Sequence, residues 1–240
     1  ILVVVFQDVL DREQLLVDRL VPHGHFVDRL RGADAGHHVL ALGVDEELAV
    51  GLALAGGRES LDRQIDAGRQ PQDILEIYDP ESDTWTTGAS LPEPLGAYAL
   101  TALNDQLYLF GGRGVQGYVA SAYRYDPQAG AWEELPPLEQ ARGFLGAAAL
   151  GEQIYVIGGY DDVTEFDTCE AYNPQTGAWA SCAPMSVPRG GLAAVAVRDY
   201  LFAIGGGMDG YLAFNERYDP RLDAWRSVET PLTEQWRDLG

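Results

Sequence analysis

Three observations in the sequence predict an all-β fold of the β-propeller type. The string Tyr-x-Pro-x-x-x-x-Trp occurs four times, with its tyrosines spaced by 47, 47 and 46 residues. A pair of glycines follows a short apolar run three times, spaced by 47 residues each time. The runs between these markers are short, rich in β-branched and aromatic residues, and broken by Gly and Pro. Repeats of this length with four short strands each are typical of propeller blades.

One repeat unit, residues 141–187, shows the expected order of strands. Residues 144–150 are small and apolar, and residues 153–157 are β-branched and aromatic up to a glycine pair. Residues 168–172 alternate and end at an Asn-Pro turn, and residues 178–182 carry the Trp. No apolar period of 3.6 residues joins these runs, so helical repeats are excluded. The unit therefore predicts four antiparallel strands.

The residue types suit a radial arrangement of blades. The expected innermost strands, residues 97–103, 144–150 and 192–197, are rich in Ala and Gly, which fit where blades converge. The Tyr and Trp markers fall on outer strands, where blades diverge and more volume must be filled. The first string runs from Tyr78 to Trp85. The other repeat residues with a predicted structural role are Gly111, Gly112, Tyr125, Trp132, Gly158, Gly159, Tyr172, Trp179, Gly205, Gly206, Tyr218 and Trp225.

The pattern over residues 74–240 resembles the kelch repeat. The resemblance rests on the glycine pair after an apolar strand, Tyr-Asp-Pro or Tyr-Asn-Pro, the Trp, and Pro188-Arg189-Gly190. Pro94-Leu95-Gly96 departs from it because the Arg is missing. The resemblance implies a kelch-type β-propeller, whose rings usually have six or seven blades. Because the repeats supply an incomplete arc of about three to four blades, we expect a fragment of a longer protein.

Residues 1–73 differ in composition from the rest, which places a boundary near Asp73. They contain no Tyr or Trp but all four His. One interpretation is a degenerate blade, with an inner strand at residues 37–42 and a second strand at 52–55. Another is a helix that begins at Asp8 and ends by Pro22. A third is a segment with no native fold, and the sequence leaves all three open.

The charge of the chain limits the classes of partner. Its 16 basic residues are all Arg and stand against 37 acidic residues, so the net charge is -21. Such a surface repels phosphate backbones and anionic lipids, so nucleic acid and membranes are excluded as partners. The longest apolar run, residues 1–6, is far shorter than the ~20 residues of a membrane span. We therefore expect no membrane insertion.

The two cysteines bear on the compartment. The register that pairs Tyr172 with Trp179 across a hairpin also pairs Cys169 with Cys182, which puts the sulfurs within reach of a bridge. A disulfide would indicate an oxidising compartment, whereas two reduced thiols are the alternative. The use of Arg alone hints at a bacterial source. Whether the protein is cytoplasmic or secreted therefore depends on the state of this pair.

One rim of the propeller is the expected binding surface. Antiparallel order brings the loops between second and third strands to the same rim as the linkers between blades, and such loops commonly carry function. Tyr and Arg are enriched at binding hot spots. The alternative for each candidate is an ordinary solvated loop residue. The candidates are Arg113, Gln116, Tyr118, Tyr160, Asp161, Asp162, Met208, Asp209 and Tyr211.

Other motifs predict no metal and no cofactor. Residues 112–117 match G-x-G-x-x-G, but a strand rather than a helix is expected next, so a dinucleotide site is excluded. Asp161, Asp162, Glu165 and Asp167 lack the spacing of a calcium loop. The four His have no zinc-finger spacing around them. Arg142 and Arg189 recur at equivalent positions, and we expect them to bond loop carbonyls.

The sequence favours a non-enzymatic scaffold that binds a protein or peptide through its loop rim. The alternative is a carbohydrate-binding or sugar-active propeller, because some kelch propellers resemble galactose oxidase. That class needs copper held by His and Tyr, and residues 74–240 contain no His. A Ser or Cys nucleophile there would also lack a His partner. Exposed rings such as Tyr118 and Tyr211 keep glycan binding open.

Overall fold

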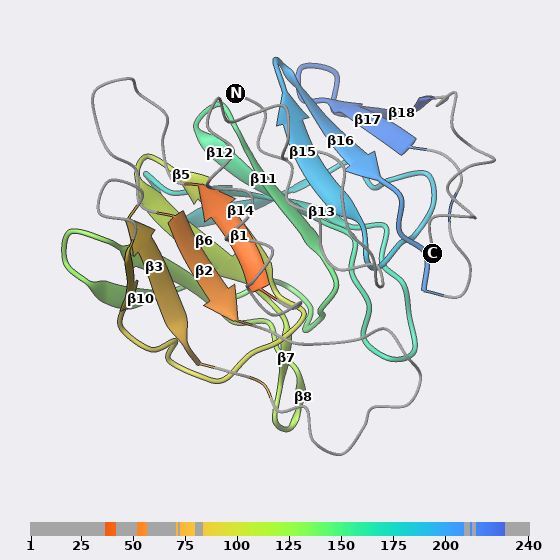
Figure 1. Cartoon of the computed structure of the whole chain (residues 1–240). Helices are drawn as coiled ribbons and strands as arrows, with labels where there is room; N and C mark the ends of the chain where they lie inside the picture. Colours follow the sequence, from red (N-terminus) through yellow and green to blue (C-terminus); the bar gives the residue numbers. More distant parts are fainter. Residues whose placement is uncertain are drawn as a thin grey trace.

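A computed structural model of the chain describes residues 37–41, 52–56, 71, 73–79, 84–208, 212 and 215–228. These residues form four four-stranded antiparallel sheets, which we call blades 1 to 4, and one small hairpin (Figure 1). No helix occurs among the residues just given, and accordingly none there could cross a membrane. The prediction of an all-β propeller is confirmed.

Each blade follows the chain from an inner to an outer strand. Blade 1 contains β1 (His37–Ala41), β2 (Leu52–Gly56), β3 (Leu75–Asp79) and β4 (Thr84–Thr87). Blade 2 contains β5 (Ala99–Leu103), β6 (Gln106–Phe110), β9 (Ala122–Asp126) and β10 (Ala131–Leu135). Blade 3 contains β11 (Gly146–Leu150), β12 (Gln153–Ile157), β13 (Cys169–Asn173) and β14 (Ala178–Cys182). Blade 4 contains β15 (Ala193–Val197), β16 (Tyr200–Ile204), β17 (Asn215–Asp219) and β18 (Ala224–Val228). The hairpin is β7 (Arg113–Gly114) and β8 (Gly117–Tyr118), which lies between β6 and β9 in the sequence.

Blade 1 extends across the change in composition near Asp73. β1 and β2 precede that residue, β3 and β4 follow it, and all four strands belong to one sheet. This is the arrangement expected of the degenerate-blade interpretation of residues 1–73. The helix proposed between Asp8 and Pro22 lies outside the described residues.

The inner strands lie side by side in the order β1, β5, β11, β15, and small residues lie at the contact between β11 and β15. Gly146 on β11 faces Ala194 on β15. A Cβ atom built on Gly146 would lie only 2.8 Å from the Cβ of Ala194. The neighbouring strands can therefore approach only because these side chains are small.

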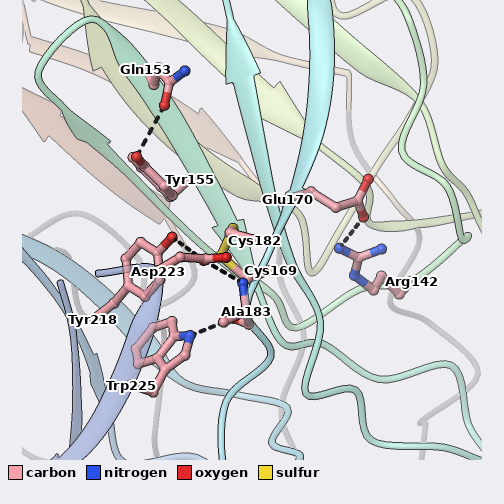
Figure 2. Close-up of a disulfide and its surroundings, with 10 residues drawn as sticks. All are labelled: Arg142, Gln153, Tyr155, Cys169, Glu170, Cys182, Ala183, Tyr218, Asp223 and Trp225. Atoms are coloured by element: carbon pink, nitrogen blue, oxygen red, sulfur yellow. Dashed lines mark hydrogen bonds and ion pairs between the residues drawn. A yellow bond between two sulfur atoms is a disulfide. The ribbon is translucent and has the colours of Figure 1, made fainter. Parts of the chain in front are cut away.

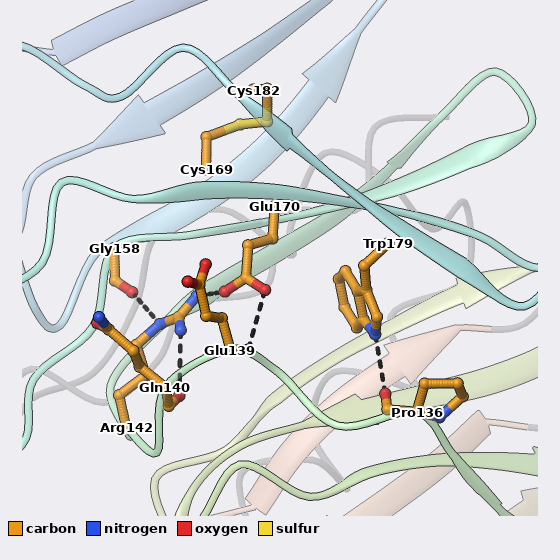
Figure 3. Close-up of polar contacts among 9 residues, drawn as sticks. All are labelled: Pro136, Glu139, Gln140, Arg142, Gly158, Cys169, Glu170, Trp179 and Cys182. Carbon is orange, nitrogen blue, oxygen red and sulfur yellow. Dashed lines mark hydrogen bonds and ion pairs between the residues drawn. A yellow bond between two sulfur atoms is a disulfide. The ribbon is translucent and has the colours of Figure 1, made fainter.

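The repeated Tyr and Trp pack against each other and join adjacent blades. Tyr172 and Trp179 are opposite each other in the β13–β14 register, with ring centroids 4.9 Å apart. Tyr172 is buried, and the Trp179 indole also contacts Phe110 of blade 2 edge-on at 5.4 Å. The Trp179 Nε1–H donates to the carbonyl oxygen of Pro136 at 2.8 Å (Figure 3). We call this bond to the preceding blade the indole clamp; it recurs from Trp132 to Ala89 and from Trp225 to Ala183.

The glycine pairs allow a linker to cross the end of a strand. Gly158 and Gly159 have φ values of +63° and +118°, in the left-handed region that favours glycine. A Cβ on Gly158 would lie 2.5 Å from the Arg189 carbonyl oxygen of the following linker. The Gly159 N–H donates to that same oxygen at 3.0 Å. The pair thus fixes the linker between blades 3 and 4 at the predicted rim.

Candidate functional site

The loops and linkers of neighbouring blades are joined by backbone hydrogen bonds into one rim. The Gly143 N–H donates to the Tyr160 carbonyl at 2.9 Å, and the Tyr160 N–H returns a bond to Gly143 at 2.8 Å. Gly96 and Arg113 form the same bridge one blade earlier. Phe144 N–H donates to Ala97 of the preceding blade at 2.7 Å. The loops are therefore held to one another, as a binding surface requires.

A buried arginine supports this rim from below. The Arg142 side chain is completely buried, and its Nη2 donates to Glu170 Oε1 at 2.7 Å (Figure 3). Its Nε and Nη1 donate to the carbonyl oxygens of Gly158 and Gln140 at 2.9 and 3.2 Å. The other Glu170 oxygen accepts the Glu139 N–H at 3.2 Å. The expectation that Arg142 bonds loop carbonyls is confirmed.

The same construction recurs between blades 3 and 4. Arg189 is fully buried, donates to the Gly205 carbonyl at 3.0 Å, and pairs with the buried Glu216 at 3.3 Å. Burial lowers the pKa of Arg189, and the Glu216 carboxylate acts in the opposite direction. The buried charge of Arg189 is therefore stable only while the Glu216 carboxylate lies beside it.

The junction between blades 1 and 2 uses neutral side chains at the equivalent positions. Leu95 replaces the arginine and is fully buried, which accounts for the departure from the repeat. Tyr123 occupies the position of Glu170 and donates from its hydroxyl to Glu93 at 2.9 Å. Burial, aided by this bond to Glu93, raises the pKa of Tyr123 to about 12. The positions beneath the rim therefore hold either an ion pair or a neutral pair.

Five side chains meet at the junction of blades 2 and 3, and we call them the aromatic–acidic patch. The Tyr118 ring reaches from β8 to within 6.5 Å of the Phe144 and Tyr160 rings, measured between centroids. Its hydroxyl donates to Asp162 Oδ1 at 3.1 Å. The Arg113 guanidinium lies 5.6 Å from the Tyr118 ring centroid, and its Nη2 lies 3.8 Å from Asp162 Oδ2.

Local backbone features place the patch. Asp161 Oδ1 accepts the N–H groups of Val163 and Thr164 at 3.0 and 2.7 Å, which closes a turn around Asp162. Asp162 itself adopts φ +77°. Gly143 leaves room for the Tyr118 ring, because a Cβ there would lie 2.8 Å from Tyr118 Cε1.

The structure brings together four of the nine predicted site residues. Arg113, Tyr118, Tyr160 and Asp162 come together in the patch, whereas the Asp161 carboxylate bonds its own turn. Gln116 is exposed at the tip of the β7–β8 hairpin. Met208 lies at the next junction, where its N–H donates to Glu165 Oε1 at 2.6 Å. Asp209 and Tyr211 lie outside the described residues.

Sequence reasoning missed three rim residues. Phe144 was expected to begin an inner strand, but it lies in the patch with φ +53°. Val115 and Val163 are 71% and 87% exposed at the tips of adjacent loops. The available signal was a valine in each of two loops on one rim, since a single exposed apolar residue carries none.

Two other motifs of the sequence, the possible metal ligands and the glycine-rich stretch, can be compared with the described part of the chain. No three His, Cys, Asp or Glu side chains there are grouped to hold a metal ion. The G-x-G-x-x-G stretch forms the β7–β8 hairpin instead of leading into a helix. It therefore lacks the helix N-terminus that a dinucleotide phosphate needs.

The structure joins Cys169 and Cys182 in a disulfide between β13 and β14, with Cα atoms 5.1 Å apart (Figure 2). Ala183, next to the bridge, contacts blade 4 through both backbone groups. Its N–H donates to Asp223 Oδ1 and its carbonyl accepts from Trp225 Nε1, both at 2.7 Å. The bridge thus lies beside an attachment point between blades 3 and 4.

The family model for the KLHDC2/KLHL20/DRC7 kelch-repeats domain matches residues 46–235. The chain belongs to the kelch-repeat family. Kelch-repeat domains typically serve as scaffolds for protein–protein interaction. The match begins before Asp73 and therefore includes β2, which has no aromatic residue, whereas the second strands of the other blades, β6, β12 and β16, each contain at least one.

Two curated proteins illustrate the likeness to other kelch proteins. Alpha-scruin from Limulus polyphemus is 36% identical over 83 residues, 35% of this chain and 8% of scruin. Kelch-like protein 1 from Mus musculus is 45% identical over 47 residues, 20% of this chain and 6% of that protein. The matched segments thus span less than a tenth of either relative.

Proposed function

We propose that this kelch domain is a non-enzymatic scaffold that binds a protein or peptide through the rim containing the aromatic–acidic patch. The observation that carries the proposal is the pair of exposed valines, Val115 and Val163, on loops from adjacent blades. Four of the five patch residues lie in those same two loops, which are joined by the Tyr118 hydroxyl donating to Asp162. Exposed apolar side chains beside polar side chains that are fixed by a hydrogen bond suit the binding of a protein partner.

The geometry favours a protein over a glycan at this junction. Sugar rings stack on flat aromatic faces, but the Arg113 guanidinium lies over the Tyr118 ring, 5.6 Å from its centroid. Val115 and Val163 offer no hydrogen bonds to sugar hydroxyls. Aliphatic side chains and a shared carboxylate instead match the side chains of a peptide.

The test is a selection of displayed random peptides on the immobilised full chain, followed by affinity measurements with the synthetic peptides. We expect Val115→Ser and Val163→Ser to weaken binding about tenfold each, as for residues at the centre of an interface. Leu222→Ser is the matched control, because Leu222 is 61% exposed at the β17–β18 turn on the opposite rim. Peptides that respond to Leu222→Ser but to neither valine would refute the proposal.

A further inference from the structure

We infer that the aromatic–acidic patch recognises a cationic side chain, Arg or Lys, of a partner peptide. This inference rests on the proposed function and names the chemistry of its partner. The patch consists of Arg113, Tyr118, Phe144, Tyr160 and Asp162 at the junction of blades 2 and 3.

The patch already holds one cation, from the chain itself. The Arg113 guanidinium lies over the Tyr118 ring at 5.6 Å and faces Asp162 Oδ2 at 3.8 Å. An aromatic ring together with a carboxylate is the environment that attracts Arg and Lys. Arg113 thus shows what kind of group the patch accommodates.

Asp162 has capacity for a second cation. Its side chain is 58% exposed, whereas that of Arg113 is 26% exposed. A carboxylate offers about four acceptor positions, and Tyr118 uses one at 3.1 Å. The 3.8 Å separation from Arg113 is too long for a hydrogen bond, so a partner cation can bond Asp162 directly. Val163, next in the chain, would cover the aliphatic stem of that side chain.

The charge around the patch excludes an acidic partner. Arg142 and Arg189, the other arginines of the described linkers, are buried against Glu170 and Glu216. The acidic groups in the described loops and linkers of the rim are Glu93, Glu139, Asp161, Asp162, Glu165 and Asp167. With a net charge of -21 on the whole chain, this rim attracts cations and repels anionic peptides.

The probes for the test are the peptides from the selection described above. We expect Arg and Lys to be enriched among them, and replacing each by norleucine should identify one dominant cation. Asp162→Asn should weaken binding about tenfold, and affinity should fall as sodium chloride rises from about 50 to about 500 mM. Asn tolerates positive φ, so this variant keeps the turn. Asp105→Asn is the matched control, since Asp105 is exposed in the β5–β6 turn of the opposite rim, with φ +59°.

Removing the internal cation gives a second readout. Arg113→Gln should strengthen the binding of cationic peptides several-fold, because Asp162 and Tyr118 then lose their own competitor. A merely structural role of Arg113 predicts unchanged or weaker binding, which would overturn the inference.

The outcomes separate this inference from the proposed function. Peptides that respond to Val163→Ser but have no excess of Arg or Lys, or bind equally to Asp162→Asn, overturn only the inference. A selection that gives no peptide sensitive to Val115, Val163 or Asp162 refutes both.

Discussion

The indole Nε1 of Trp225 donates a 2.7 Å hydrogen bond to the carbonyl oxygen of Ala183, which lies 42 residues earlier in the preceding blade. Trp179 and Trp132 make the same bond to Pro136 and Ala89. In the described part of the chain, the tryptophan that recurs in the repeats therefore also attaches each blade to the one before it.

Replacing Trp225 by Phe should lower the free energy of unfolding by about 1 kcal/mol, because it removes this bond but keeps an aromatic ring. Urea denaturation followed by circular dichroism measures the change. Tyr200→Phe is the control, since it removes only an exposed hydrogen bond between Tyr200 and Arg221. Equal stability of Trp225→Phe and the parent chain would show that the indole clamp does not stabilise the fold.

Acid should weaken the hydrogen bond between the Asp223 carboxylate and the backbone N–H of Ala183. The Asp223 carboxylate accepts the Ala183 N–H and the Tyr218 hydroxyl, and these bonds lower its pKa below the ordinary value. A lowered folded-state pKa stabilises the protein above the unfolded-state pKa of about 3.9, and the stabilisation is lost as pH falls through the folded value. The stability difference between the parent chain and Asp223→Asn should therefore be constant from about pH 5 to 7 and shrink as the pH falls below the unfolded-state pKa of about 3.9. A difference that does not change with pH would show that the charge is irrelevant.

Reduction of the disulfide should destabilise the domain. The bridge spans 13 residues, and closing a loop of that size stabilises by about 2 to 3 kcal/mol. Denaturation with and without dithiothreitol measures the loss, and the double variant Cys169→Ser/Cys182→Ser should not respond to the reductant. Detection of two free thiols by non-reducing mass spectrometry after oxidation would show that no bridge forms.

The ion pair between Arg142 and Glu170 should tolerate replacement of both partners together by neutral residues, but not replacement of one partner alone. Arg142→Leu alone leaves Glu170 buried without its cation and should cost about 3 to 5 kcal/mol. Adding Glu170→Tyr and Gln140→Glu copies Leu95, Tyr123 and Glu93 of the preceding junction, and should recover stability to within about 1 kcal/mol of the parent. A triple variant no more stable than Arg142→Leu would mean that the two junctions are not equivalent.

A Cβ at Gly158 should disturb the packing of the rim. Gly158→Ala should cost more than about 2 kcal/mol, because strain from its positive φ adds to a clash with the Arg189 carbonyl. Gly177→Ala is the matched control, because its φ is +69° but nothing lies within 4 Å of the added atom. It should cost only about 1 kcal/mol. Equal losses at both positions would rule out the clash as a cause.

The repeat made the fold predictable from sequence. Tyr172 opposite Trp179, small residues at Gly146 and Ala194, and the glycine pairs are local features that a period of 47 residues exposes. β1 and β2 were left among alternatives because blade 1 has no aromatic residues in that part and a longer connection to β3.

The details of the rim could not be predicted in the same way. The bond between Tyr118 and Asp162 joins residues 44 positions apart in loops that do not share a sequence pattern. The φ of Phe144 and the exposure of Val163 likewise depend on how neighbouring blades pack. Residue types indicated the rim, but only packing decides which side chains meet.

The direction of the indole clamp has a consequence for biogenesis. In each case the acceptor carbonyl precedes its tryptophan donor by 42 or 43 residues. During translation, a newly emerged blade therefore finds its anchoring oxygen already present on the nascent chain. We expect such a domain to assemble one blade at a time from the N-terminal side, each blade docking on the one before it without waiting for later segments.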